Sequence, residues 1–528
     1  MSCPRPSLGA EISQSRTIYS TNGVLSATFT YNKDTTSDPS GLTRFCYMMA
    51  SGNGPATPAS SIANQSPTLR LRPGDRLELT LINTQQPVTD GVTINLPPAL
   101  VCGSNILDST STNMHFHGTH VHPTCHKDNS AYTLINGGQT FTFSIPFPAD
   151  HAPGLYWYHP HVHGLSEAAV LGGASGVLIV DGMESVFPAV AGLPEQLLVF
   201  RDQYVGPHDS SLPESEEPEV DLSVNFVQVL YPHYIPAVLT GLPPDTLVFW
   251  RLVNTAAMAN LNLRLVYDGV PQSVQLVAKD GVPLPADSNR WVTELPLATA
   301  ERVEFIARTP SSSVVNAMIL TDRVDTGPDG DANPQRPLLR IVPSPSTMNS
   351  GSTVTSVTAP TSVAASAVPA PSFAELLARP VAVNRVLYFS ERPVDPTDPD
   401  SDTVFFITVD GQPETAYSIN SLTAPPSVVS KQGTVEEWLL ENRSGENHVF
   451  HIHQIHFLVT AINGVAVGRD ALAYQDTAMV GFWDGSGPYP SLRMRLDFRG
   501  NIAGDFMYHC HILEHEDKGM MAKISVVA

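Results

Sequence analysis

Five residues near the C-terminus are of types that bind transition metals. The chain reads His509-Cys510-His511, and His515 and Met520 follow shortly after. In an extended strand successive side chains point to opposite faces, so His509 and His511 share one face and the Cys510 sulfur lies on the other. A Cys thiolate, two His and a weak axial Met form a blue-copper electron-transfer site, and the imidazoles on the reverse face can bind a second metal centre. This stretch predicts two adjacent copper sites joined through Cys510.

Other His residues occur in pairs that fit the remaining positions of two such sites. In residues 448–453, His451 and His453 share one face of a strand and His448 has the opposite parity, which matches the Cys510 segment. Two further same-face pairs stand in the N-terminal third: His115 with His117, and His159 with His161. Random placement of the 18 His gives roughly 0.6 His-x-His pairs, whereas six occur when overlaps are counted. The excess indicates that the pairs have a function.

An internal comparison separates the two kinds of ligand. Residues 154–161 and 504–511 align so that their His pairs coincide. The N-terminal copy has lost every blue-copper residue together: Thr112, Pro160, Leu165 and Val170 stand where the C-terminal copy has His448, Cys510, His515 and Met520. Scattered structural histidines would not lose one site as a unit. The N-terminal copy therefore keeps only the ligands of the shared centre.

The motifs HFHG, YWYHPH, HxxHxH and HCHxxxHxxxxM resemble the four copper signatures of the three-domain multicopper oxidases, which include laccases, cuprous oxidases and their bacterial relatives. All four occur in the family's order, and the likeness spans most of the chain. The resemblance implies four copper ions: one type 1, one type 2 and a type 3 pair. The implied ligands are His448, Cys510, His515 and axial Met520 for type 1; His115 and His451 for type 2; and His117, His159, His161, His453, His509 and His511 for type 3.

One strand pattern recurs three times and predicts three related domains. The copies lie at residues 79–83, 250–254 and 438–442, and each ends in Asn. A chain of 528 residues exceeds what one hydrophobic core usually supports. Its 46 Pro, 36 Gly and few long helical patterns indicate short strands joined by turns, as in β-sandwiches. With the resemblance, the expected fold class is all-β, with three cupredoxin-like Greek-key β-sandwich domains.

The domain boundaries follow from composition and from the motifs. We expect a first domain over 1–190 with half of the trinuclear ligands, and a second over 191–345 that acts as a spacer without copper. A linker rich in Ser, Thr, Ala and Pro covers 346–371. The third domain, 372–528, holds the type 1 copper and the other half of the trinuclear ligands, and begins with a short helix over 372–379.

Charge and hydropathy restrict the partners. The formal net charge of −22 argues against nucleic acid, because neutralising phosphates needs clustered Lys and Arg. The charge favours solubility, and it can attract cationic substrates or metal ions; we favour simple solubility. No run is long enough to span a membrane. The first thirty residues show no signal peptide, so either an export signal has been removed or the protein is cytoplasmic. We favour removal and expect an exported, periplasmic or secreted monomer.

Four cysteines remain besides Cys510. Cys3, Cys46, Cys102 and Cys125 permit two disulfides in three connectivities, and Cys102 and Cys125 flank the HFHG motif. Four buried free thiols are the alternative. Disulfides would place the protein in an oxidising compartment.

The resemblance also implies a mechanism and two acids that assist it. Electrons enter at the type 1 copper, near an exposed edge of His448 or His515, and pass through Cys510 to the trinuclear cluster, where dioxygen becomes water. Glu516 stands where relatives carry a proton-relay acid, and Asp128 is the candidate for a second acid on the type 2 side. Surface carboxylates are the alternative reading for both.

Further histidines lie near these motifs but are not expected to bind copper. We expect His120, His122 and His126 to surround the centre or face solvent, and His456 to have a packing role.

Three functions fit these residues. The first is a laccase-like oxidase that transfers electrons from phenols and aromatic amines to dioxygen. The second is a metallo-oxidase of Cu(I), Fe(II) or Mn(II), which needs a carboxylate or Met site near His448; the lack of a Met-rich insert weakens the Cu(I) variant. The third, a non-catalytic copper-binding protein, is disfavoured because storage would not require the Cys-bridged pair of sites.

Overall fold

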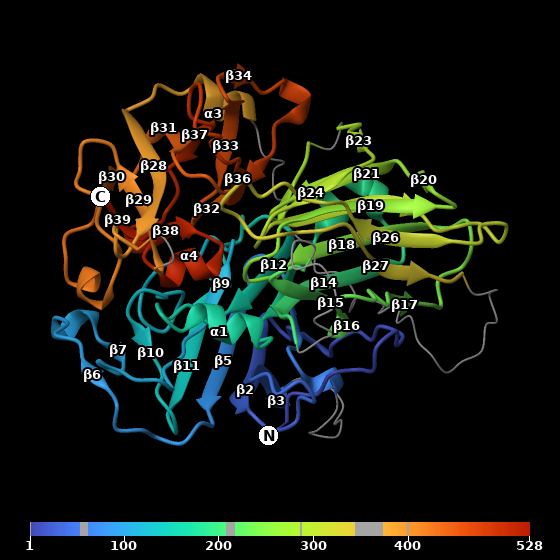
Figure 1. Cartoon of the computed structure of the whole chain (residues 1–528), viewed down its shortest axis with the longest axis horizontal. Coiled ribbons are helices and arrows are strands. Elements are labelled where there is room, and N and C mark those ends of the chain that lie inside the picture. The colour runs from blue at the N-terminus through green and yellow to red at the C-terminus, as the bar shows by residue number, and fades with distance from the viewer. Residues whose placement is uncertain (1, 53–61, 207–216, 286–287, 344–372, 399–400) are drawn as a thin grey trace.

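The computed structural model describes residues 2–52, 62–206, 217–285, 288–343, 373–398 and 401–528. The linker predicted over 346–371 lies outside these residues. Figure 1 shows three lobes, with the N-terminal part below, the middle part at the right and the C-terminal part at the upper left. Each lobe is built mainly from β-sheets, and the fold-class prediction of three cupredoxin-like β domains is confirmed. The exact domain boundaries stay a prediction.

The first lobe contains two main sheets. One has the order β1 (Thr17–Tyr19), β4 (Thr68–Leu71), β13 (Gly176–Val180), β12 (Gly154–His159) and β9 (His115–His117), and the other has the order β11 (Thr140–Pro146), β5 (Arg76–Asn83), β2 (Val24–Asp34) and β3 (Arg44–Gly52). Two short pairs accompany them: β7 (Cys102–Gly103) with β10 (Thr133–Leu134), and β6 (Val92–Thr93) with β8 (Ile106–Leu107). Two short helices follow strands β12 and β13: α1 (Ser166–Leu171) and α2 (Met183–Val186).

The middle lobe also has two main sheets. The first runs β16 (Val227–Val229), β15 (Val220–Val224), β14 (Glu195–Tyr204), β18 (Leu247–Asn254), β25 (Arg302–Arg308), β21 (Val274–Lys279) and β22 (Val282–Pro283), with β23 (Trp291–Val292) beside β21. The second runs β17 (Ala237–Leu239), β27 (Arg336–Ile341), β26 (Ala317–Thr321), β19 (Leu261–Tyr267) and β20 (Val270–Pro271), with β24 (Leu295–Leu297) beside β19.

The C-terminal lobe begins with helix α3 (Phe373–Ala378), close to the short helix expected from the sequence. One sheet runs β29 (Thr403–Val409), β28 (Val383–Pro393), β31 (Val435–Asn442), β37 (Ser491–Asp497), β33 (Phe457–Ile462) and β34 (Val465–Ala466), with β35 (Tyr474–Gln475) beside β33. The other runs β30 (Val428–Lys431), β39 (Met521–Val527), β38 (Gly504–Cys510), β32 (His448–Ile452) and β36 (Thr477–Val480). Helix α4 (Leu513–Asp517) follows β38 directly.

The strand repeat in the sequence appears as β5, β18 and β31. Each runs parallel to one neighbour (β2, β14 or β28) and antiparallel to the other (β11, β25 or β37). The Asn that ends each copy is buried, and its amide donates to two backbone carbonyls at 2.7–3.0 Å: Asn83 to Thr110 and Ile135, Asn254 to Ala259 and Leu297, and Asn442 to Glu446 and Gly481. A buried amide needs such partners, so the repeated Asn fixes the loop that follows each strand.

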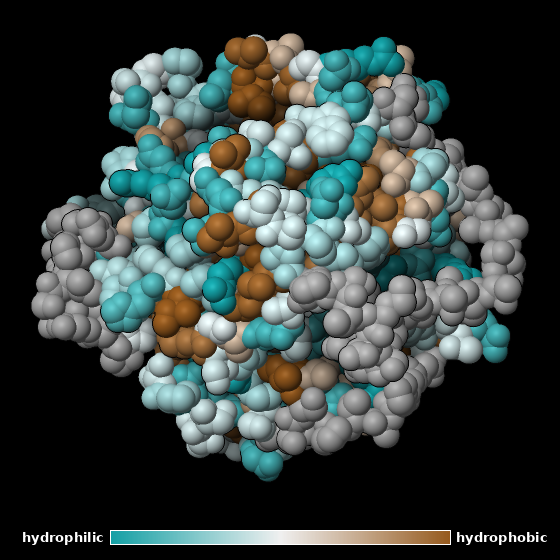
Figure 2. Space-filling model, turned by 90° about the vertical axis from the view of Figure 1, so that its right-hand side faces the viewer, coloured by the Kyte–Doolittle hydropathy of each residue, from teal (hydrophilic) through white to brown (hydrophobic). Residues whose placement is uncertain are grey.

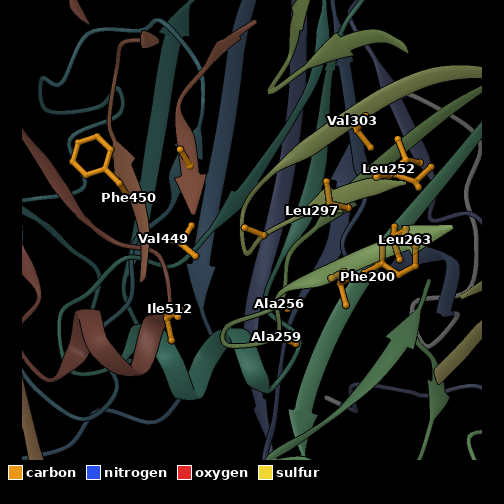
Figure 3. Close-up of a cluster of buried hydrophobic side chains, with 14 of the residues drawn as sticks. Phe200, Leu252, Ala256, Ala259, Leu263, Leu297, Val303, Val449, Phe450 and Ile512 are labelled. Atoms are coloured by element: carbon orange, nitrogen blue, oxygen red, sulfur yellow. The ribbon is translucent and has the colours of Figure 1, made fainter. Parts of the chain in front are cut away.

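The hydrophobic core is continuous between the middle and C-terminal lobes. Figure 3 shows Val449 and Ile512 of the C-terminal lobe near Ala256 and Ala259 of the middle lobe, within one buried cluster. The backbone N–H of Leu513 donates to Ala257 O at 2.8 Å, which ties the start of α4 to the middle lobe. The metal-binding motifs that border this contact are therefore held by more than one lobe.

On the face in Figure 2, hydrophobic residues form separate patches among polar side chains, apart from the area drawn in grey. Within the described ranges, no helix combines the length and the apolar character needed to cross a lipid bilayer.

Candidate metal centre

Strands β32 and β38 bring the two C-terminal motifs side by side. They pair antiparallel with His451 opposite His509 and Phe450 opposite Cys510. Alternation along each strand then separates the ligands as the sequence predicts, with the Cys510 sulfur on one face and the paired imidazoles on the other. Cys510 is buried and is not part of a disulfide.

The type 1 ligands predicted from the resemblance come together. Cys510 Sγ lies 3.7 Å from both His448 Nδ1 and His515 Nδ1, and these two nitrogens are 3.0 Å apart. The backbone N–H of Val449 points to the sulfur at 3.3 Å. Met520 is buried, and its backbone bonds to both Cys510 and His515, so it is held beside them, while its role as axial ligand stays a prediction.

The remaining eight His ligands form a second cluster between the first and third lobes. Strands β9 and β12 pair so that His159 lies opposite His115. Three groups of ring nitrogens each lie within 4.8 Å of one another: His115, His117 and His451; His117, His159 and His511; and His161, His453 and His509. In the last group, His509 Nε2 is 3.1 Å from His161 Nε2 and 3.2 Å from His453 Nε2. Each group combines ligands from both lobes, so the centre forms only when the lobes pack together.

The ring nitrogens at this cluster fit a metal site better than a packed core. Several are buried with no hydrogen-bond partner in the part of the chain that the structure describes: His115 Nε2, His117 Nδ1, His159 Nε2, His451 Nε2 and both nitrogens of His511. An unsatisfied buried polar atom costs about 1–3 kcal/mol, so such a group is unusual in a folded protein unless a ligand satisfies it. Converging imidazoles and a thiolate are a donor set that copper prefers.

Burial keeps these imidazoles in the neutral form that binds metal. Burial, reinforced by neighbouring His, lowers the pKa well below 6.5 for a group of ligands: His117, His159, His161, His448, His453, His509 and His511. The pKa of His451 falls to about 3, also mainly through burial. A metal ligand must be unprotonated, so the rings are ready to bind.

The other nitrogen of many ligand rings has a fixed partner. His159 Nδ1 and His509 Nδ1 lie 2.9 Å from the carbonyls of Pro160 and Cys510, respectively. His451 Nδ1 lies 2.9 Å from the Asp476 carbonyl. Such contacts set the tautomer and the ring orientation, as is general for metal-binding His.

Comparison with known proteins agrees with this geometry. Two family models described as multicopper oxidase match residues 98–185 and 394–528, and these segments contain every predicted copper ligand. The chain belongs to the multicopper oxidase family. As a multicopper oxidase it is a copper-binding oxidoreductase.

Relatives align over most of this multicopper oxidase. A multicopper oxidase of Staphylococcus epidermidis is 22% identical over 465 residues, which make up 87% of this chain and 81% of the relative. A variant of the McoA multicopper oxidase from Aquifex aeolicus superposes with a TM-score of 0.68 at 18% identity, covering 98% of this chain and 100% of that one. A multicopper oxidase from Campylobacter jejuni, described as a metallo-oxidase, gives 0.67 at 20% identity, covering 99% and 96%. These two structures share the fold.

Both acids proposed from the sequence lie beside ligand rings of the multicopper oxidase site. Asp128 is buried; its Oδ1 is 3.0 Å from His115 Nδ1 and accepts from Phe116 N at 3.0 Å, and its Oδ2 accepts from Gln454 Nε2 at 2.6 Å. These contacts show that Asp128 fixes the orientation of His115. Whether it also moves protons stays a prediction.

Glu516 lies beside two other rings of the cluster. Its two carboxyl oxygens are 3.7 Å from His161 Nδ1 and 3.1 Å from His509 Nδ1. Burial, together with repulsion from Asp517, raises the pKa of Glu516 well above its ordinary value. The shift favours the neutral, protonated form of this carboxyl, and its role in moving protons stays a prediction. The alternative of a surface carboxylate does not hold for Glu516, nor for Asp128, since both are buried.

No sequence motif points to Asp476, which nevertheless contacts two ligand rings. Its Oδ1 is 3.2 Å from His117 Nε2 and 3.7 Å from His451 Nδ1. Burial opposes ionisation of Asp476, but the guanidinium of Arg302 overcomes it and holds the pKa of this carboxyl well below its usual range. A single Asp between strands gives no periodic signal, so only the packed structure identifies it.

The extra histidines divide between the surroundings of the site and the surface. His456 Nε2 lies 3.2 Å from Asp476 Oδ2, and His120 contacts the other nitrogen of His456. His122 is half-buried, and His126 is exposed and stacks on Phe141 with ring centroids 4.7 Å apart. The structure gives His456 a polar contact with the carboxylate as well as packing.

The outer edge of the type 1 site is covered by carboxylates. His448 is fully buried and His515 is 4% exposed, so the expected exposed His edge is not found. Glu446 Oε1 is 3.3 Å from His515 Nε2, and Glu391, Glu446 and His448 offer ligand atoms within 4.8 Å of one another. Burial and the neighbouring Glu446 raise the pKa of Glu391 to about 9. Burial and the nearby acids Asp331 and Glu514 raise that of Glu446 to about 7.

Two disulfides are formed among the four remaining cysteines. Cys3 pairs with Cys46, and Cys102 pairs with Cys125. The second bridge joins the segments on either side of the HFHG motif, as one of the three possible connectivities allows. It thereby braces the loop that contains Asp128, three residues after Cys125.

Proposed function

We propose that this multicopper oxidase holds four copper ions and couples one-electron oxidation of a small reducing substrate to the reduction of dioxygen to water. When bound, the copper ions supply the redox chemistry, taking single electrons from the substrate and delivering four to dioxygen. The proposed type 1 ligands are His448, Cys510, His515 and Met520, and the type 2 ligands are His115 and His451. The type 3 ligands are His117, His159, His161, His453, His509 and His511. The groups of converging, unsatisfied ring nitrogens support this assignment.

Cys510 and its two neighbours link the sites. The sulfur faces His448 and His515, while His509 and His511 belong to groups on the other side of the strand. Only the covalent bonds of a three-residue segment separate the two sets of ligands. We propose that this segment is the path for electrons between them.

Glu516 and Asp128 are proposed to donate or accept protons beside different rings of the trinuclear ligands. Burial raises the pKa of Glu516 and so favours its protonated form, which lies beside His161 and His509 and could donate a proton there. Asp128 holds the tautomer of His115 and contacts the type 2 side.

We further propose that the reducing substrate is a metal cation, with Fe(II), Cu(I) and Mn(II) as candidates. The observation that carries this is the acidic cover of the type 1 site, where Glu391 and Glu446 reach the buried rings of His448 and His515. Fe(II) and Mn(II) fit this edge better than Cu(I), because carboxylate oxygens suit the harder divalent cations, whereas Cu(I) prefers sulfur ligands. Glu446, together with Glu391 once its proton is displaced, would supply the site near His448 that a metallo-oxidase requires. The similarity to a metallo-oxidase of Campylobacter jejuni supports the same reading.

Oxidation of phenols and aromatic amines, the first function expected from the sequence, is the second candidate. The acidic edge would also attract a protonated aromatic amine. A bulky neutral phenol would have to approach two rings that are almost fully buried, which makes it the poorer fit.

The experiment that tests the proposal combines metal analysis with oxygen uptake. The copper-loaded protein is expected to contain four copper ions and to be blue. Oxygen consumption is then compared for Fe(II), Cu(I), Mn(II), neutral phenols and aromatic amines, with the autoxidation of each substrate subtracted. Faster turnover of neutral phenols than of all three cations would contradict the substrate proposal, and fewer than four bound copper ions would contradict the site assignment.

Export and a monomeric state remain proposals. The two disulfides favour an oxidising compartment, because they are rarely kept in the cytosol. Size-exclusion chromatography with light scattering tests the monomer.

A further inference from the structure

Arg302 comes from the middle lobe, which has no predicted copper ligand, yet it binds a carboxylate that contacts the predicted trinuclear ligands. It is the first residue of β25 and is fully buried. All three of its guanidinium nitrogens donate: Nε to Leu155 O at 3.2 Å, Nη1 to Ala300 O at 3.1 Å and Asp476 Oδ1 at 2.8 Å, and Nη2 to Asp280 O at 2.8 Å and Asp476 Oδ2 at 2.6 Å. The five N–H groups of the fork are thus all used. One side chain therefore connects all three lobes.

The pair formed by Arg302 and Asp476 is bidentate. Each carboxylate oxygen accepts from a different nitrogen of the guanidinium, a geometry that fixes the carboxylate plane as well as its position. The middle lobe makes a second contact, because Asp280 Oδ2 accepts from the backbone N–H of Asp476 at 3.3 Å. Asp476 is therefore oriented largely by the middle lobe.

Asp476 transmits this orientation to the predicted copper ligands. Its Oδ1 lies 3.2 Å from His117 Nε2, and its backbone carbonyl lies 2.9 Å from His451 Nδ1. The opposite ring nitrogens, His117 Nδ1 and His451 Nε2, are buried without a partner and belong to one group of converging ligands. The contacts with Asp476 thus set which nitrogen of each ring is free to bind metal.

The glycine of the HFHG motif gives independent support. Gly118 has a φ of +82°, and a Cβ there would come within 2.2 Å of Arg302 Nη2 and 2.6 Å of Asp476 Oδ2. A side chain at this position would displace the ion pair. Since His117 precedes this glycine directly, the ligand motif and the guanidinium occupy a shared, closely packed space.

We propose that Arg302 is a positioning residue of the trinuclear copper centre, acting through Asp476 on His117 and His451. The proposal rests on the copper assignment given under Proposed function. It changes the role of the middle lobe, which the sequence suggests to be a spacer. The lobe supplies the counter-ion that orients ligands from both outer lobes.

The test replaces Arg302 and follows the metal itself. In Arg302→Met the carboxylate loses its bidentate partner, so His117 and His451 are no longer held. Substitutions around metal ligands typically weaken metal affinity by about 10–100-fold. We therefore expect Arg302→Met to release type 2 copper at a roughly 10–100-fold lower chelator concentration, with a changed type 2 electron paramagnetic resonance signal. The blue absorption of the type 1 site, which Arg302 does not touch, is expected to persist.

Arg251→Met is the matched control. Arg251 is also buried in the middle lobe, on the neighbouring strand β18, and pairs with Glu304 at 2.8 Å and Glu195 at 3.1 Å. It therefore controls for the loss of a buried ion pair of a middle-lobe arginine. We expect this control to lower the unfolding temperature without changing the chelator concentration or the type 2 signal.

Two further variants separate positioning from a general loss of stability. In an Asp476→Asn background, Arg302→Met is expected to cause little additional copper loss, because residues that act through one another are not additive. If Arg302→Met does not fold, Arg302→Lys keeps the charge but cannot hold both carboxylate oxygens, and is still expected to change the type 2 signal.

The possible outcomes distinguish this inference from the assignment beneath it. If the wild-type protein binds no copper, the proposed function itself is contradicted. If the wild type binds copper normally, and the Arg302 variant has the same type 2 signal and copper affinity as the control, only the positioning role of Arg302 is overturned.

Discussion

Removing one carboxylate from the acidic edge tests whether the reducing substrate is a cation. Glu446 Oε1 is 3.3 Å from His515 Nε2, and its side chain is 13% exposed. Glu446→Gln keeps the size of the side chain and removes its charge. If a metal ion binds at this edge before it is oxidised, the variant should bind it more weakly.

The size of the effect follows from Coulomb's law. A unit charge about 4 Å from a carboxylate gains about 1 kcal/mol in water and about 4 kcal/mol at an effective dielectric constant near 20. Because Glu446 is mostly but not fully shielded, we take roughly 2 kcal/mol, which corresponds to about a 30-fold rise in KM for the cation. A neutral phenol has no such attraction to lose, so its KM should change less than about twofold.

The assay is initial-rate oxygen uptake above pH 7, where the Glu446 carboxyl, with its pKa near 7, is mainly ionised in the wild type. The cation that the wild type oxidises fastest is compared with a neutral phenol in both proteins. Glu437→Gln is the control, since this carboxylate pairs with Arg493 at 2.9 Å and Arg495 at 3.1 Å instead of facing the type 1 rings. An unchanged KM for the cation, or an equal rise for cation and phenol, would refute the reasoning.

Three further predictions concern the ligands and the buried acid–base groups. Cys510→Ser should abolish the blue colour and the oxidase activity together, because the thiolate is both the proposed type 1 ligand and the proposed link to the other ligands. Colour that persists in this variant would exclude the role. Glu516→Gln should slow reoxidation by dioxygen at least tenfold in stopped-flow measurements, because the amide cannot release a proton, while type 1 reduction stays nearly intact. Equal slowing of both steps would contradict a proton-relay role for Glu516. Burial lowers the pKa of His151 from 6.5 to about 4, and its Nε2 accepts from His120 N at 3.1 Å. The unfolded state therefore binds the proton more tightly, so this contribution to stability is present above pH 6.5 and is lost as pH falls toward 4. It amounts to roughly 3 kcal/mol. His151→Gln should flatten the pH dependence of the free energy of unfolding in that window, and an unchanged slope in denaturant titrations would contradict it.

The candidate ligands could be recognised in the sequence because the pattern that marks them is local. Strand alternation alone places Cys510 and its two neighbouring His on opposite faces, and the structure confirms that separation. The repeated strand ending in Asn likewise predicted three related domains, since each copy must pair with the same neighbours and bond the same loop. The disulfide partners were open among three connectivities, because pairing depends on distances that the sequence does not contain.

What the sequence determined by itself is the chemistry of this protein: which side chains can bind copper, in what order they occur and on which face of a strand each one lies. Only the tertiary structure decided how that chemistry is controlled. Arg302 and Asp476 are 174 residues apart in the chain, and Glu391 and His448 belong to different strands, so no local pattern relates the members of either set. These contacts form only when sheets from different parts of the chain pack together. A charge that becomes buried in this packing needs a partner of opposite charge or a hydrogen-bond donor, and that partner can come from another lobe.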